Sequence, residues 1–278
     1  MISAATRVAG VIGDPVRHSL SPAIHNAAFS EAGLDWIFLA FEVVDGDAAV
    51  AVNGARALGF DGLSVTMPHK ATVIGALDRL SPTAERLGAV NAIVREGTEL
   101  VGHSTDGAGL IDALTHDEGF DATGRRCVVI GAGGAARAAV LSLADAGAAE
   151  VVVVNRSAHN AERAATLAGG VGRVGSQDDV RDADLVVNAT PIGMTGQPEI
   201  PAVAGDLFHA NQLVVDLVYT PPITATVKAA RAAGAHGVSG LGMLVHQAAH
   251  AFTLWTGHDA PLPAMSAAAM AALAHLHR

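Results

Sequence analysis

Residues 127–137 read CVVIGAGGAAR, a short strand-like run that passes directly into a glycine-rich turn and then into an Ala/Leu-rich helical stretch. The turn has the form G-x-G-x-x-A. Gly131 permits the tight turn, Gly133 lets the backbone approach a pyrophosphate, and Ala136 permits close packing of the helix on the strand. The start of the helix attracts an anion. The segment therefore predicts a dinucleotide-binding unit, with a purely structural turn as the alternative.

The end of the next predicted strand indicates which dinucleotide is bound. An Asp or Glu at this place would bind the ribose hydroxyl of NAD, but the sequence has Asn155, Arg156 and Ser157. The planar guanidinium of Arg156 suits a phosphate, and Ser157 adds a hydroxyl group. These residues favour NADP over NAD. An ordinary helix cap beside an exposed arginine is the alternative.

Short β-branched runs alternate with Ala-rich stretches along the chain, which predicts βαβ units and an α/β fold with a mainly parallel sheet. The predicted strands are Val8–Gly13, Trp36–Val43, Leu63–Thr66, Ala92–Arg95, Cys127–Gly131, Val151–Asn155, Leu185–Asn188 and Leu213–Asp216. The predicted helices include Pro22–Ala32, Ala135–Ala146, Ala158–Leu167, Leu241–Trp255 and Ala264–His277.

The length of 278 residues suggests about two domains. We place a substrate-binding and catalytic domain at residues 1–106 and a Rossmann-like nucleotide-binding domain at residues 107–243. The tail has no strand of its own, so we expect its helices, residues 244–278, to cross back and complete the first domain.

The composition excludes several classes of protein. Lys and Arg total 17 against 27 for Asp and Glu, a net charge of −10, which argues against nucleic-acid binding. One cysteine cannot form an intramolecular disulfide and fits a reducing compartment. The N-terminus lacks a signal-peptide pattern, and no apolar run reaches the roughly 20 residues of a membrane helix. We therefore expect a cytoplasmic protein that does not bind membranes.

Polar loops follow several predicted strands. Ser19 and Ser21 come after the first strand, and helix capping accounts better for Ser21 than for Ser19. Two hydroxyl groups at the carboxyl end of a strand suit a small carboxylated or polyhydroxylated molecule. Lys70 follows the third strand in the segment LSVTMPHK, although surface lysines are common. Asp106 lies at a helix start, where capping is the alternative role.

Lys70 and Asp106 are suited to one reaction. An enzyme that reduces a ketone with a nicotinamide needs a proton donor at the oxygen, because negative charge develops there. A lysine positioned by a carboxylate can supply that proton. The spacing leaves open which of the two groups gives up the proton.

Nine motifs occur in order along nearly the whole chain: HSLSP, SVTMPHK, GAVNAI, STDG, GAGGAAR, NRS, NATPIGM, DLVYTPPIT and GLGMLVHQA. Together they resemble the shikimate dehydrogenase family. The resemblance implies NADPH-dependent reduction of 3-dehydroshikimate to shikimate, a step in aromatic amino acid biosynthesis, by a monomer or homodimer.

The resemblance also implies roles for individual residues, with Lys70 and Asp106 as the catalytic pair. Residues implied to bind the substrate carboxylate are Ser19, Ser21 and Tyr219, and those implied to bind its ring hydroxyls are Thr66, Asn91, Asp106 and Gln247. Residues implied to bind NADP are Gly131, Ala132, Gly133, Gly134, Ala135, Asn155, Arg156 and Ser157, with Thr190, Leu217, Gly240 and Met243 beside the nicotinamide. A core methionine is the alternative for Met243.

Three positions depart from the family pattern. Ser64 stands where the family commonly has Asn, and Ala71 where an acidic residue often follows the lysine. Asn160 replaces a second basic residue often found after the NRS motif, so NADP preference would depend more heavily on Arg156.

Three other functions share these motifs: a quinate/shikimate dehydrogenase that uses NAD, an aminoshikimate-type dehydrogenase, and an inactive NADP-binding sensor. Arg156 argues against the first. The sequence does not separate the second, and the third should lack Lys70 or Asp106. His246 and His250 are the only histidines at helical spacing and have no third partner in the sequence, so we predict no metal.

Overall fold

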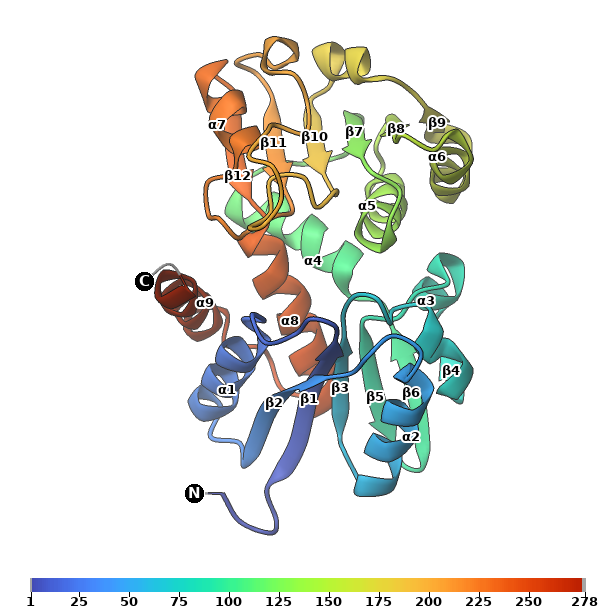
Figure 1. Ribbon diagram of the computed structural model, residues 1–278, viewed down its shortest axis with the longest axis vertical. Coiled ribbons are helices and arrows are strands. Elements are labelled where there is room, and N and C mark those ends of the chain that lie inside the picture. Colours follow the sequence, from blue (N-terminus) through green and yellow to red (C-terminus); the bar gives the residue numbers. More distant parts are fainter. Residues whose placement is uncertain (1, 277–278) are drawn as a thin grey trace. The chain divides into compact units, whose positions relative to one another are not determined.

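The structure, a computed structural model, describes residues 2–276 and divides into two compact units (Figure 1). The first unit comprises residues 1–105 and 245–278, and the second comprises residues 106–244. Within the described residues no helix is both long and apolar enough to cross a membrane. The functional roles expected for the two units remain predictions.

The first unit contains a six-stranded mixed sheet. In spatial order its strands are β2 (Trp36–Glu42), β1 (Arg7–Gly13), β3 (Gly62–Val65), β5 (Ala92–Glu96), β6 (Glu99–His103) and β4 (Arg79–Leu80). β5 runs antiparallel to β3 and β6, and the other pairs are parallel. Four of these strands were predicted, whereas β4 and β6 were not. β6 arises from a hairpin that turns at Gly97, whose φ is +64°.

Helices cover both faces of this sheet. They are α1 (Ser21–Glu31), α2 (Ala48–Leu58), α3 (Pro82–Leu87), α8 (Leu241–Thr256) and α9 (Leu262–Leu276), with a 3₁₀ turn at Thr72–Ala76. Trp255 of α8 donates from Nε1 to the carbonyl oxygen of Ile93 at 3.0 Å. A Cβ on Gly62 would lie 2.4 Å from that indole nitrogen, so only glycine admits the ring. The predicted return of the C-terminal helices to the first sheet is confirmed.

The second unit is a doubly wound Rossmann-like domain with six parallel strands. Their spatial order is β12 (His236–Ser239), β11 (Leu213–Asp216), β10 (Leu185–Asn188), β7 (Arg126–Ile130), β8 (Glu150–Val154) and β9 (Gly172–Val174). The order reverses between β7 and β10, and sheets of this kind bind ligands beyond the carboxyl ends of the strands at such a point. The four predicted strands and the α/β fold class are confirmed. The short β9 and β12 were not among the predicted strands.

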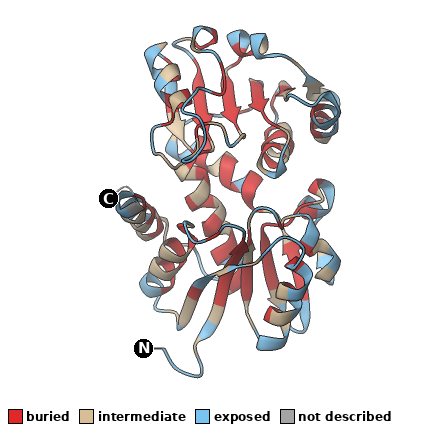
Figure 2. Cartoon of the chain, in the orientation of Figure 1, coloured by how far each residue is buried: buried red, intermediate tan, exposed pale blue. Residues whose placement is uncertain are grey.

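Both faces of the second sheet are covered, which explains its continuous apolar strands. Cys127 and Val129 face one apolar cluster, while Val128 and Ile130 face another. The four central strands, β11, β10, β7 and β8, are accordingly buried along most of their length (Figure 2). The helices of this unit are α4 (Asp106–Asp112), α5 (Gly134–Asp145), α6 (Ala158–Ala165) and α7 (Ala225–Ala232). A π-helical segment lies at Ala113–Asp117, and 3₁₀ segments lie at Thr166–Val171, Gln177–Asp182 and Gly205–Leu207.

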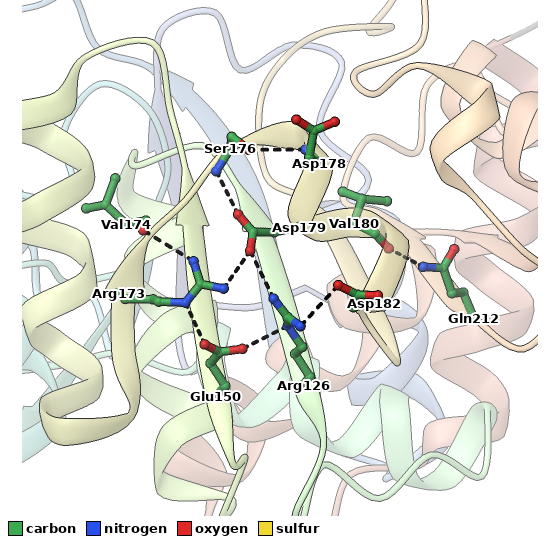
Figure 3. Close-up of polar contacts among 10 residues, drawn as sticks. All are labelled: Arg126, Glu150, Arg173, Val174, Ser176, Asp178, Asp179, Val180, Asp182 and Gln212. Carbon is green, nitrogen blue, oxygen red and sulfur yellow. Dashed lines mark hydrogen bonds and ion pairs between the residues drawn. The ribbon is translucent and has the colours of Figure 1, made fainter.

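An ion-pair network joins the amino ends of β7 and β8 to the edge strand β9 (Figure 3). Arg126 pairs with Glu150 at 2.8 Å and with Asp179 at 2.9 Å. Arg173 pairs with the same two carboxylates, each at 2.5 Å. Hydrogen bonding to Arg173 lowers the pKa of Asp179. The network ties the three-residue edge strand to the rest of the sheet.

Candidate active site and cofactor site

The carboxyl edge of the first sheet gathers most of the residues expected to bind substrate. β1, β3 and β6 end at this edge, and the antiparallel β5 begins there. The amide of Thr66 donates to Ile12 O at 3.0 Å, and the amide of Val65 donates to Asn91 O at 2.8 Å. The loops at this edge carry Ser19, Ser21, Thr66, Lys70 and Asn91.

The backbone of Lys70 is fixed on both sides. The carbonyl oxygen of Lys70 accepts a hydrogen bond from the amide of Val90 at 2.7 Å. Nε2 of the buried His69 lies 2.7 Å from Val43 O, and it must carry the proton because a carbonyl only accepts. The lysine therefore projects from an ordered loop at the edge of the sheet, which is a better place for chemistry than a mobile surface segment.

The two serines differ from the sequence-based expectation in their local bonding. Capping was expected to explain Ser21 better, but the amide of Ser21 donates to Ser19 Oγ at 3.2 Å. Leu20 precedes α1 without a side-chain cap, and Ser21 is the first residue of the helix. The alternative role of Ser21 as a helix cap therefore does not hold, and the expected substrate contact of the two serines stays a prediction. The contact uses a lone pair of Ser19 and leaves its hydroxyl hydrogen able to donate to a carboxylate.

Asn91 and Gln247 come together although 156 positions separate them. Asn91 Nδ2 donates to Gln247 Oε1 at 3.2 Å, which joins the start of β5 to α8. Thr105 completes the group through contacts with both residues. The pairing of Asn91 with Gln247 agrees with their expected common role, but Thr105 was not among the predicted site residues.

Asp106 is the first residue of α4 in the second unit. The positive end of a helix stabilises an ionised carboxylate. The next residue, Gly107, lies so close to α5 that a Cβ there would be 3.1 Å from Ala138 O and 2.9 Å from Ser142 Cβ. Asp106 is thus carried by a helix packed on the helix that follows the glycine turn. Its pairing with Lys70 remains a prediction.

The glycine turn after β7 has the features that the sequence predicts for it. Gly131 has a φ of +115°, and a Cβ there would lie 3.1 Å from Ala189 O and from Thr190 Cγ2. A Cβ on Gly133 would meet no atom within 4 Å, so the backbone there is open to a ligand. Ala136 is wholly buried against the sheet. Gly134 begins α5, while Ala132 and Ala135 are half-buried. The turn fits a bound pyrophosphate.

The segment after β8 fits both roles that its sequence allows, a helix cap and a site for a 2′-phosphate. Ser157 Oγ accepts the amide of Asn160 at 3.3 Å and so caps α6, while Asn155 Nδ2 donates to Ser157 O at 3.1 Å. Arg156 is exposed, and no carboxylate follows the strand. Burial and the positive charge of Arg163 lower the pKa of Arg137 in the neighbouring helix α5. The segment fits a 2′-phosphate better than a ribose hydroxyl.

Two buried residues missed by sequence reasoning organise the loop after β10. Asn188 Nδ2 donates to Asp216 Oδ1 at 2.8 Å, and Thr224 Oγ1 donates to Asp216 Oδ2 at 2.6 Å. Burial raises the pKa of Asp216. Thr190 Oγ1 donates to Asn188 Oδ1 at 2.7 Å, so the expected nicotinamide-side threonine is held by this network. Asn188 ends β10 and Asp216 ends β11, and these positions were the signal from which sequence reasoning could have found the two residues.

The remaining residues expected near the nicotinamide lie in the same unit. A Cβ on Gly240 would be only 2.4 Å from Leu217 O, so glycine is required where these two segments touch. Met243 is buried in the apolar cluster beside α5, so its contacts in this structure are those of a core methionine.

Tyr219, which is expected to bind the substrate carboxylate, belongs to the same unit. Burial raises the pKa of Tyr219, so its phenol stays protonated and able to donate.

The structure contains no group of three or more His, Cys, Asp or Glu side chains placed to hold a metal ion within residues 2–276. Cys127 is fully buried in β7, and burial raises the pKa of its thiol to about 12. The prediction of a metal-free site stays a prediction.

Comparison with known proteins agrees with this geometry. Residues 11–93 match the family model for the shikimate dehydrogenase substrate binding domain, residues 119–218 a putative NAD(P)-binding model, and residues 240–270 the shikimate 5′-dehydrogenase C-terminal domain. A protein named shikimate dehydrogenase (NADP(+)) from Methanopyrus kandleri is 46% identical over 280 residues, covering 97% of each chain. The chain belongs to the shikimate dehydrogenase family. The resemblance drawn from the nine motifs is therefore confirmed.

Solved members of the shikimate dehydrogenase family share the whole fold. One, in complex with NADP⁺, has a TM-score of 0.92 and 37% identity, covering 98% of this chain and 97% of its own. Another, from Thermus thermophilus in complex with NADP(H) and shikimate, has a TM-score of 0.90 and 36% identity, covering 96% of this chain and 99% of its own. The likeness extends over both units of the chain.

Proposed function

We propose that this chain catalyses the reversible NADPH-dependent reduction of 3-dehydroshikimate to shikimate. The observation that carries the proposal is the gathering of Lys70, Asn91 and the paired serines at one sheet edge of the first unit. The glycine turn and the exposed Arg156 of the second unit support NADP as the cofactor. Relatives named for this activity match nearly the full length of the chain.

In the proposed mechanism NADPH, when bound, supplies a hydride to the ketone carbon. Lys70 donates a proton to the oxygen on which negative charge develops, and in the reverse direction it accepts that proton. Asp106 positions Lys70 and keeps the pair neutral. The substrate carboxylate is held by Ser19, Ser21 and Tyr219, and the ring hydroxyls by Thr66, Asn91, Asp106 and Gln247.

The cofactor residues follow the same proposal. Gly131, Ala132, Gly133, Gly134 and Ala135 hold the pyrophosphate, while Asn155, Arg156 and Ser157 hold the adenosine end. Thr190, Leu217, Gly240 and Met243 lie along the nicotinamide. We further propose that the enzyme acts in the cytoplasm as a monomer or homodimer, without metal or nucleic acid. The net charge of −10 supports the absence of nucleic acid, and the single free thiol fits a reducing compartment.

An absorbance assay at 340 nm tests the function. The purified chain is given shikimate, quinate or aminoshikimate, each with NADP⁺ or NAD⁺. We expect the highest kcat/KM with shikimate and NADP⁺. A higher value with quinate and NAD⁺ would assign the chain to quinate oxidation, and activity with aminoshikimate alone would assign it to the specialised pathway. Cofactor binding without turnover of any substrate would indicate a sensor.

Replacing Arg156 tests the phosphate site. We expect Arg156→Ala to weaken NADPH binding roughly 10- to 100-fold, because a hydrogen bond between charged groups contributes about 1.5–3 kcal/mol. NADH binding should change little, since it has no 2′-phosphate. Titration of each nucleotide by fluorescence measures both constants. Arg181→Ala, which removes another exposed arginine of the same unit, is the control. Equal losses for the two nucleotides would contradict the phosphate role.

A further inference from the structure

Thr105 lies at the centre of the polar group that joins Asn91 to Gln247. Its amide donates to Asn91 Oδ1 at 2.7 Å, and its hydroxyl oxygen accepts from Asn91 Nδ2 at 2.9 Å. The same hydroxyl donates to the backbone oxygen of Gln247 at 3.0 Å. Only 4% of Thr105 is exposed, so a ligand cannot reach it.

We infer that Thr105 is a positioning residue that sets three proposed substrate contacts at once: Asn91, Gln247 and Asp106. The inference rests on the proposed function. Asn91 is held through both ends of its amide, so its side chain has one orientation. Gln247 is held through its backbone. Asp106 is the next residue along the chain, so fixing the backbone of Thr105 also fixes where the helix carrying the carboxylate begins.

The chemistry of the threonine explains why a hydroxyl is needed at this place. Its oxygen accepts one hydrogen bond while its hydrogen donates another, which neither valine nor alanine can do. Loss of the hydroxyl removes the 2.9 Å contact of the buried Asn91 Nδ2, which is shorter than its 3.2 Å contact with Gln247 Oε1. A buried donor that loses a hydrogen bond costs free energy, so the asparagine side chain would shift to recover one.

The test compares five variants for kcat and KM with shikimate, for the Kd of NADP⁺ alone and for Tm: three single variants at Thr105 and Thr256, then Asn91→Ala and its combination with Thr105→Val. Thr105→Val keeps the shape and removes the hydroxyl, while Thr105→Ser keeps the hydroxyl. Thr256→Val is the matched control, because Thr256 Oγ1 also donates to a backbone oxygen of α8, that of Phe252, at 2.8 Å.

We expect Thr105→Val to lower kcat/KM roughly 10- to 100-fold, with a raised KM for shikimate and an unchanged Kd for NADP⁺. Thr105→Ser should be close to the wild type. Thr256→Val should change Tm but not kcat/KM. Asn91→Ala should lower kcat/KM, and adding Thr105→Val to it should cost less than Thr105→Val costs the wild type, because part of the effect of Thr105 passes through Asn91.

Three results would overturn the inference: wild-type kcat/KM in Thr105→Val, a fully additive double variant, or a large loss in a folded Thr105→Ser. The last result remains decisive even if the valine variant does not fold. A wild-type chain that binds NADP⁺ but fails to oxidise shikimate would instead refute the proposed function itself. Failure of the inference about Thr105 can therefore be told apart from failure of the proposed function.

Discussion

Lys70→Met should lower kcat for shikimate oxidation by roughly 10²- to 10⁴-fold, the usual contribution of a general acid or base. Methionine keeps the length of the side chain but cannot hold or transfer a proton. The backbone contact from Val90 to the Lys70 carbonyl is retained, so the loop should keep its place. The Kd of NADP⁺ should not change, because the glycine turn belongs to the other unit.

Steady-state rates and a nucleotide titration measure the two quantities. Lys228→Met is the control, since Lys228 forms an exposed ion pair with Glu199 at 2.7 Å, apart from the proposed chemistry. Near-wild-type kcat in Lys70→Met would remove the lysine from the mechanism.

The second large effect concerns stability in acid and arises from His25 of α1. Its ring is fully buried, stacks on Phe38 with ring centroids 4.4 Å apart, and lies tilted against Trp255 with ring centroids 4.9 Å apart. Neither ring nitrogen has a hydrogen-bond partner among the described residues. Burial lowers the pKa of His25 from 6.5 to about 3.

The sign of the effect follows from where the proton binds. Below pH 6.5 the unfolded chain gains a proton at this histidine, whereas the folded chain does not until about pH 3. The free energy of unfolding therefore falls by about 1.4 kcal/mol per pH unit across this window, or roughly 3 kcal/mol between pH 6.5 and pH 4. Above pH 6.5 the contribution is constant.

Urea unfolding at several pH values measures this effect in the wild type and in His25→Leu. The variant should lose most of the pH dependence between pH 6.5 and pH 4. His258→Leu, at an exposed histidine of the same unit, should keep it. Identical pH dependence in all three proteins would show that folding does not lower the pKa of His25.

The strongest sequence signals were local ones, and these were sufficient for the nucleotide-binding half. The run 127–137 combines a buried strand, a turn that only glycine can make at Gly131 and a helix start, so each residue has one structural role. The eight predicted strands all occur, because their β-branched and aromatic residues favour extended backbone in a sheet.

Features that depend on distant residues were harder to predict. β6 contains Glu99, Gly102 and His103, so it has no apolar alternation, and it becomes a strand only by pairing with β5. Thr105 looked like part of a polar turn, because its partners lie 14 and 142 positions away. Capping accounted better for Ser21 than for Ser19 in the sequence, but it is the Ser19 hydroxyl that accepts the amide of Ser21. Either serine can serve a helix start, and only the backbone path decides between them.

The position of Cys127 in β7 has a practical consequence for handling the protein. With a thiol pKa of about 12, the reactive thiolate makes up only about one part in 10⁵ at pH 7. Alkylating reagents and air oxidation should therefore spare this thiol in the folded chain, so activity can be measured without added reductant. Labelling of this cysteine would then report unfolding of the nucleotide-binding sheet.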